Sequence, residues 1–173
     1  MDDARKVQLL WDKLAVEQLM LQFGQALDRH DWVAYRRCFT DRIDVDFRDL
    51  VGLPPVRVDA DRWTAFAKAA LDSVKCLHQY TNHLVHVRGD YADGVLYMEA
   101  KHFRLTERGG CENVQHGWYE NTYTRVDGNW KISKLGQRLA WVSGNEGVLD
   151  LHSAAVRAEF EAVFGPAMGA QII

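Results

Sequence analysis

The apolar residues near the start of the chain follow the spacing of one buried helix face. Val16, Leu19, Met20, Phe23 and Leu27 recur at intervals of three and four positions. This spacing predicts an amphipathic helix over residues 4–30. The pattern that follows predicts a short helix over 32–39, a strand over 43–47 and a third helix over about 61–73.

From about residue 79 the apolar and polar residues alternate with a period of two, which is typical of strands with one buried face. The alternating segments cover 79–88, 94–105, 114–126 and 129–142, and a last helix is expected over about 153–164. Helices followed by a meander of strands predict an α+β fold, with helices packed on one side of a curved antiparallel sheet. We expect a single domain over residues 1–173.

Strand parity predicts which polar side chains face the core. In GVLYMEAKHFRL, His102 lies on the more apolar face, so it should point inward. In NHLVHV, His83 shares a face with the two valines. Arg138 shares the inward parity of its strand, although a bulge at Gly136 would reverse that. His83, His102 and Arg138 are therefore the inward polar candidates.

Asp28 is placed where the first helix ends, in QFGQALDRHDW. A carboxylate is disfavoured there, because the unpaired carbonyls at a helix C-terminus carry partial negative charge. A carboxylate beside an imidazole in an apolar cavity can move protons, because it fixes the tautomer and leaves the other ring nitrogen as a base. The simpler alternatives are a hydrogen-bonded core histidine and an Asp28 that caps the next turn. The histidines at 30, 78, 116 and 152 are interpreted as surface or structural residues.

Composition excludes several functions. The formal net charge of −3 gives no electrostatic basis for binding nucleic acid or an anionic membrane. Cys38, Cys76 and Cys111 are widely spaced, so neither a disulfide framework nor a structural zinc site is expected. The charged N-terminus has no signal-peptide pattern, which favours a cytoplasmic protein. There is no phosphate-loop or nucleotide fingerprint, so we expect neither a cofactor nor a metal.

Three segments, FGQALDRHDWVAYRRCFTDRIDVDFRD, YTNHLVHV and YTRVDGNWKISKLG, together resemble the SnoaL-like branch of the nuclear-transport-factor-2-like superfamily. The resemblance covers about residues 14–143. It implies a cone-shaped α+β barrel with a deep pocket between sheet and helices. Lyases of this branch, such as scytalone dehydratase, bile-acid 7α-dehydratase and hexachlorocyclohexane dehydrochlorinase, share a catalytic Asp and His. These match Asp28 and His83, with a second His near His102 and an Arg near Arg138.

The resemblance implies a cofactor-independent lyase that acts by dehydratase-type elimination on a cyclic apolar small molecule or an aromatic compound. The predicted catalytic residues are Asp28, His83 and His102. The predicted substrate-binding residues are Phe23, Phe47, Tyr80, Asn82, Tyr119 and Arg138. The alternatives are an isomerase or polyketide-cyclase-type enzyme with the same dyad, or a non-catalytic module that binds a ligand or resembles a dioxygenase small subunit.

We also expect a homodimer or homotrimer, because Tyr97, Phe103 and Trp141 would lie on the outer face of the sheet.

Overall fold

The computed structural model describes residues 2–151 and 153–166. Its elements are α1 (Asp3–Asp28), α2 (Trp32–Arg37), β1 (Phe39–Asp46), α3 (Arg48–Val51), β2 (Val56–Asp59), α4 (Ala60–Leu71), β3 (Lys75–Arg88), β4 (Tyr91–Thr106), β5 (Gly109–Val126), β6 (Asn129–Gly144), the short 3-10 helix η1 (Glu146–Val148) and α5 (Ala154–Phe164). The expected order of helices and strands is confirmed, whereas α3 and β2 were not predicted. His152 and the two ends of the expected domain, Met1 and residues 167–173, lie outside the described residues.

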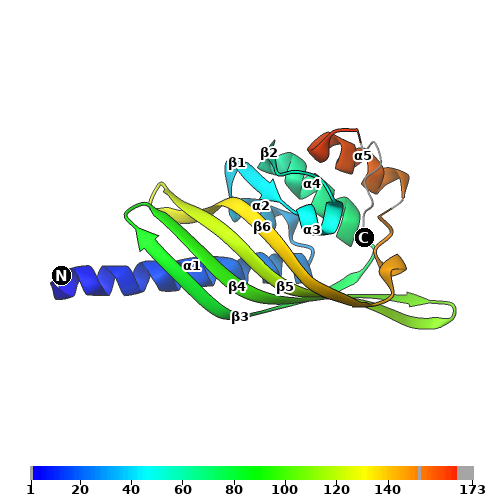
Figure 1. Cartoon of the computed structure of the whole chain (residues 1–173), viewed down its shortest axis with the longest axis horizontal. Coiled ribbons are helices and arrows are strands. Elements are labelled where there is room, and N and C mark those ends of the chain that lie inside the picture. The colour runs from blue at the N-terminus through cyan, green and yellow to red at the C-terminus, as the bar shows by residue number, and fades with distance from the viewer. Residues whose placement is uncertain (1, 152, 167–173) are drawn as a thin grey trace.

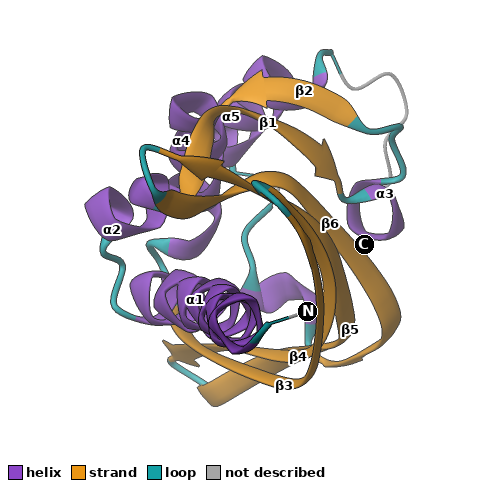
Figure 2. Ribbon diagram, turned by 90° about the vertical axis from the view of Figure 1, so that its left-hand side faces the viewer, coloured by secondary structure: helices purple, strands orange, loops and turns teal. Residues whose placement is uncertain are grey.

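The described strands form one sheet in the order β2-β1-β6-β5-β4-β3. Neighbouring strands are antiparallel except for β1 and β6, which are parallel, so the sheet is not a pure antiparallel meander. The long strands curve around α1, and α2 and α4 lie across the opening that the curved sheet leaves (Figure 2). The predicted α+β fold with a curved sheet and helices on one side is confirmed. None of the described helices is both long and apolar enough to cross a lipid bilayer.

The helix α1 lies along the concave side of the sheet, and its first turns extend beyond the ends of the strands (Figure 1). Its start is capped by Asp2, whose carboxylate accepts a hydrogen bond of 2.8 Å from the backbone N–H of Arg5. Near its other end Gly24 makes room for a side chain of β3, since a Cβ there would lie 2.7 Å from Cε2 of Tyr80. Tyr80 therefore packs directly against the helix.

A bulge divides β3 into two halves with opposite parity. The pairing with β4 shifts by one residue between Thr81 and Leu84, and Asn82 has a φ of +53°. Before the bulge, His78 and Tyr80 lie on the helix side of the sheet, while after it Val85 is the buried residue. On β3, even-numbered residues therefore face the helix before the bulge, and odd-numbered residues face it after the bulge.

A second shift of register decides the orientation of Arg138. Thr122 pairs with Lys134 and Tyr123 pairs with Ile132, so the extra residue on β6 is Ser133. The bulge that was expected at Gly136 is thus at Ser133, three residues earlier, and it exchanges the inward and outward positions of the residues that follow. As a result the side chain of Gln137 is buried, whereas that of Arg138 belongs to an ion-pair network.

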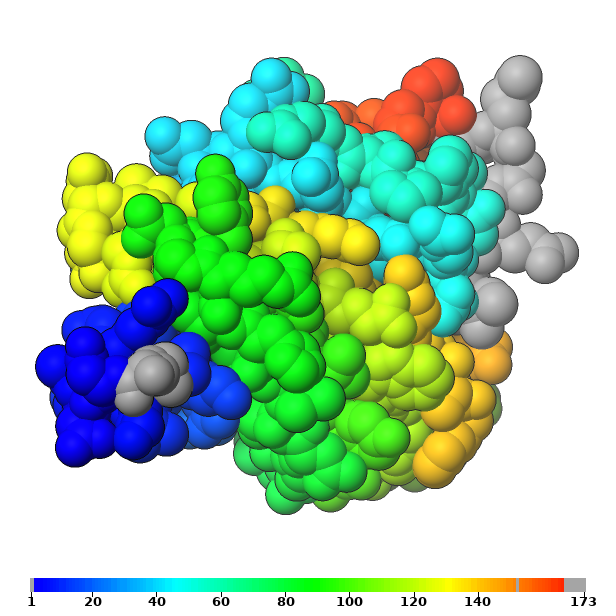
Figure 3. All heavy atoms as spheres, turned by 60° about the vertical axis from the view of Figure 1, so that its left-hand side comes forward, coloured from blue at the N-terminus to red at the C-terminus, as the bar shows by residue number. Residues whose placement is uncertain are grey.

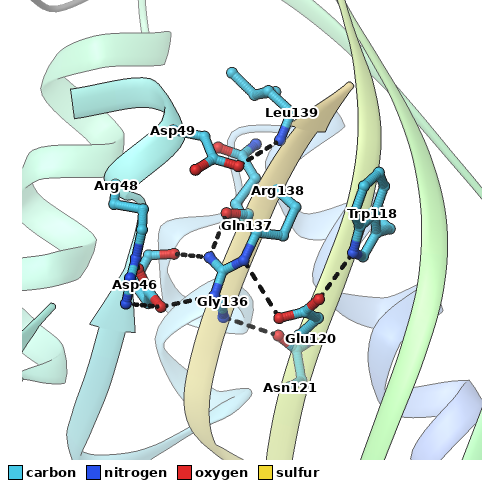
Figure 4. A network of polar contacts seen from close by, with 10 residues as sticks. All are labelled: Asp46, Arg48, Asp49, Trp118, Glu120, Asn121, Gly136, Gln137, Arg138 and Leu139. Carbon is cyan, nitrogen blue, oxygen red and sulfur yellow. Dashed lines mark hydrogen bonds and ion pairs between the residues drawn. The ribbon is translucent and has the colours of Figure 1, made fainter. Parts of the chain in front are cut away.

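This network joins β1, α3, β5 and β6 (Figure 4). Asp46 has a side chain that is only 3% exposed. It accepts hydrogen bonds from Nε and Nη2 of Arg48 at 2.8 and 2.9 Å, and from Nη2 of Arg138 at 2.7 Å. Nε of Arg138 also lies 3.3 Å from a carboxylate oxygen of Glu120. Burial raises the pKa of Asp46, but the two guanidinium groups outweigh burial and lower it to about 2.

The Asp46 network predicts a loss of stability in acid. Because the folded-state pKa is depressed, the stabilisation is present above the unfolded-state value near 3.8 and is lost as the pH falls through about 2. A shift of this size corresponds to about 2 kcal/mol. We expect Asp46→Asn to lose about this amount at pH 7, with a flatter pH dependence between pH 4 and 2. Urea unfolding at a series of pH values measures both effects, and an unchanged pH profile in the variant would contradict the assignment.

Candidate active site

A small cavity of about 90 Å³ lies between the sheet and the helices. Most of its wall is apolar or aromatic, and only four of its side chains, His78, His102, Gln115 and Gln137, are imidazoles or amides. The other lining residues are Phe23, Leu27, Tyr35, Phe47, Leu50, Trp63, Phe66, Ala67, Ala70, Leu71, Ala100, Tyr119, Leu149 and Leu151. Polar groups that share such a wall interact strongly, because little water screens them.

Asp28 and His78 form a hydrogen-bonded pair beside this cavity. Oδ1 of Asp28 lies 2.7 Å from Nδ1 of His78. The backbone N–H of His78 donates to the two carboxylate oxygens at 2.9 and 3.2 Å. The imidazole is 4% exposed and the carboxylate 20% exposed. The unfavourable position of an acid at the end of α1 is thus compensated by donors from β3.

The pair has the arrangement of an acid–base dyad. An ionised carboxylate only accepts hydrogen bonds, so the proton between the two groups belongs to Nδ1 of His78. The lone pair of the ring then lies on Nε2, which hydrogen-bonds to none of the described residues. Since His78 lines the cavity, Nε2 is the nitrogen available to take a proton from a molecule bound there.

The predicted pairing of Asp28 with His83 is wrong. The imidazole bound to Asp28 belongs to His78, which the sequence interpretation had placed among the surface or structural residues. His83 is half-buried, follows Asn82 in the bulge of β3, and is not among the residues that line the cavity. The strand begins at Lys75 rather than at residue 79, so His78 lies inside it.

His102 faces the cavity, as its parity indicated. It is 3% exposed, and its ring centroid lies 6.0 Å from that of His78. Burial and the neighbouring His78 lower the pKa of His102 to about 4, and the opposing effects of Asn113 and Asp28 are smaller. The imidazole is therefore neutral near pH 7. Its Nδ1 is buried without a hydrogen-bond partner among the described residues.

The predicted aromatic residues lie at or beside the cavity. Phe23, Phe47 and Tyr119 are part of its wall. Tyr80 lies next to it, with its ring centroid 6.4 Å from that of Phe23 and 6.0 Å from that of Tyr119. Burial raises the pKa of both tyrosine hydroxyls, so they are protonated donors at neutral pH.

Two predicted substrate-binding residues lie elsewhere. Asn82 is exposed, and its positive φ belongs to the bulge of β3. Asparagine is one of the few non-glycine residues that adopt this conformation readily. Arg138 is held by Asp46 in the ion-pair network and does not line the cavity.

The sequence interpretation missed His78, Gln115 and Gln137. Gln115 lies on the buried face of β5, and its parity with the buried Tyr119 could have identified it. Gln137 could not be identified in that way, because the extra residue Ser133 reverses the parity of β6.

Comparison with known proteins agrees with this architecture. The model of the SnoaL-like domain family matches residues 8–136. No curated protein has a significant sequence match to the chain. The solved structure of Kfla4162 from Kribbella flavida is similar, with 21% identity, a TM-score of 0.76, and coverage of 81% of this chain and 97% of that one.

Two further similar structures carry names that describe a reaction. A candidate scytalone dehydratase from Novosphingobium aromaticivorans has 18% identity and a TM-score of 0.68, covering 82% of this chain and 92% of that one. The hexachlorocyclohexane dehydrochlorinase LinA-type3 from Novosphingobium barchaimii has 18% identity and a TM-score of 0.64, covering 82% and 95%. At these identities the likeness concerns the fold, and the family follows from the match over most of the chain: this protein belongs to the SnoaL-like domain family.

Proposed function

We propose that this protein is a cofactor-independent lyase that removes a proton from a small cyclic substrate by means of the Asp28–His78 dyad. The observation that carries the proposal is the 2.7 Å contact between the Asp28 carboxylate and Nδ1 of His78 at the wall of an aromatic cavity. In this dyad His78 replaces the His83 of the sequence prediction.

The reaction begins at a ring carbon next to an electron-withdrawing group. Nε2 of His78 takes the proton, and the imidazolium that forms is stabilised by the carboxylate of Asp28. The electrons of the broken C–H bond form a C=C bond, and the bond from the neighbouring carbon to its hydroxyl oxygen breaks. The proton on His78 passes to the departing hydroxide, so the products are an unsaturated ring and one water.

His102 is proposed to stabilise the negative charge that develops on the substrate. A neutral imidazole can donate one N–H without releasing its proton, and His102 remains neutral because its pKa is about 4. The hydroxyl of Tyr80, which is buried without a partner among the described residues, and that of the buried Tyr119 are further donors near the same wall. Fixed donors in a site that excludes water favour a developing oxyanion.

The names of two similar structures support an elimination. They describe a dehydratase and a dehydrochlorinase, both of which remove a small group and form a double bond. The volume of about 90 Å³ favours one ring over a fused polycycle.

The test uses cyclic β-hydroxy ketones with one ring, such as 3-hydroxycyclohexanone. We expect the wild-type protein to form the conjugated enone, seen by ultraviolet absorbance, with the loss of one water in the mass spectrum. A product of unchanged mass would instead indicate the isomerase alternative. If none of these ketones reacts faster with the protein than without it, the result favours the non-catalytic module.

We also propose that the protein forms a homo-oligomer through the outer face of the sheet, a broad surface built from the long strands (Figure 3). Tyr97 and Trp141 are 52% and 60% exposed on this face, where they line a shallow groove with Trp118. A second copy that covers these rings removes them from water. We expect Trp141→Lys to lower the mass measured by light scattering after gel filtration, and a wild-type monomer would contradict the proposal.

A further inference from the structure

Two glutamine side chains at the cavity wall are incompletely hydrogen-bonded. Gln137 is 4% exposed and Gln115 is 5% exposed. Nε2 of Gln137 donates to Oε1 of Gln115 at 3.3 Å and to Sδ of Met98 at 3.6 Å. Oε1 of Gln137 is buried and has no hydrogen-bond partner among the described residues. If the oxygen and nitrogen of both amides were exchanged, the unpaired atom would be Nε2 of Gln137 instead of its Oε1.

An unpaired amide oxygen of this kind is free to accept a hydrogen bond from a ligand. Burying a polar atom without a partner is costly, and buried polar groups in folded proteins are nearly always paired. Gln137 and Gln115 are both part of the cavity wall. A bound molecule can therefore provide the donor that Oε1 of Gln137 lacks, while Nε2 of Gln115, which has no partner among the described residues, can donate in return.

The register of the sheet places this amide pair opposite the dyad. His78 on β3 pairs with Ala100 on β4, and Ala100 pairs with Gln115 on β5. His78 and Gln115 are thus two strand spacings apart, roughly 10 Å. The small side chain of Ala100 leaves the space between them free, and the cavity lies over it. A six-membered ring bound here would have one edge toward His78 and the other toward the amides.

We propose that the cavity binds a single-ring molecule with a hydroxyl group, and that the Gln115–Gln137 pair binds this hydroxyl through Oε1 of Gln137. The inference rests on the proposed function, because it places the reacting edge of the same ring at His78. Gln137 is then a specificity-determining residue. A ring with a halogen or a methyl group at this position leaves the amide oxygen unpaired, so hydroxylated rings are selected over halogenated ones.

The test is a binding measurement that needs no turnover. Phenol, fluorobenzene and toluene are titrated into the wild-type protein and into Gln137→Leu, and the Kd values are obtained by NMR. We expect the preference for phenol over toluene to fall by about tenfold in Gln137→Leu, because only phenol loses a hydrogen bond. Fluorobenzene should behave like toluene. Gln25→Leu is the matched control, since Gln25 is exposed on α1 and lies outside both the cavity and the groove of the outer face.

Two results would overturn the assignment: an unchanged preference in Gln137→Leu, or no binding of any of the three rings to the wild-type protein. Gln137→Met, which keeps the length of the side chain, gives the same comparison if the leucine variant unfolds. The proposed function fails separately. If His78→Gln retained turnover while the preference for phenol still depended on Gln137, the dyad would be wrong and the amide site would remain.

Discussion

Replacing His78 with glutamine is expected to lower kcat/KM by about two to four powers of ten on any substrate that the wild-type protein converts. Glutamine keeps a polar side chain next to Asp28 but has no basic nitrogen. The substrate proton then has no acceptor, while the wall of the cavity is otherwise unchanged. The initial rate of enone formation, measured at several substrate concentrations, gives kcat/KM for both proteins.

His83→Gln is the matched control for this experiment. It is the same substitution on the same strand, but His83 is not part of the cavity wall. We expect its kcat/KM to stay within about threefold of wild type. A large loss in His83→Gln together with full activity in His78→Gln would restore the pairing predicted from the sequence and reject the dyad.

The largest expected effect on stability is that of Phe23→Ala, at about 3–5 kcal/mol. Phe23 is 1% exposed and makes close ring contacts with residues of α2, β1 and β5. The ring centroids lie 5.2 Å away at Tyr35, 6.0 Å at Phe39 and 5.9 Å at Tyr119. Removing the ring leaves a void at the cavity wall that these neighbours can fill only in part. Unfolding in urea, followed by tryptophan fluorescence, measures the loss.

Leu10→Ala provides the comparison on the same helix. Leu10 is 67% exposed, so its removal is expected to change the free energy of unfolding by less than about 0.5 kcal/mol. Similar losses in the two variants would show that the ring of Phe23 has no special role in the core, because helix propensity alone changes little in either replacement.

Much of the fold could be predicted from the sequence because it depends on periodic burial. The apolar face of α1 and the alternation in β4 are local patterns, and the inward position of His102 followed from them directly. The short elements α3 and β2 have four residues each, which is too few for either period to be recognised.

The pairing of Asp28 could not be predicted in the same way, because it depends on where a strand starts and where it bulges. Counting alternate residues back from Val85 and Val87 predicts that His83 faces inward. This count fails before the bulge, because the inserted residue exchanges the inward and outward positions. On the other side the inward residues are His78 and Tyr80. Asn82 was the sequence feature that could have indicated the bulge, since an asparagine within a strand can adopt the positive φ that the bulge requires.

The orientation of Arg138 could not be predicted either, because a bulge in β6 changes which residues face inward. The inserted residue is Ser133, and nothing in its side chain marks it as a bulge. The sequence contains the partner Asp46, but the ion pair joins residues that are 92 positions apart. Only the parallel pairing of β1 with β6 brings these two charges together.

The most direct test of the dyad is the tautomer of His78 in the protein labelled with ¹⁵N-histidine. Long-range ¹H–¹⁵N NMR spectra distinguish a protonated Nδ1 from a protonated Nε2. The structure predicts that His78 carries its proton on Nδ1, that Asp28→Ala removes this preference, and that the signals of His83 do not change. A proton on Nε2 of His78, or a response to Asp28→Ala at His83 alone, would contradict the account.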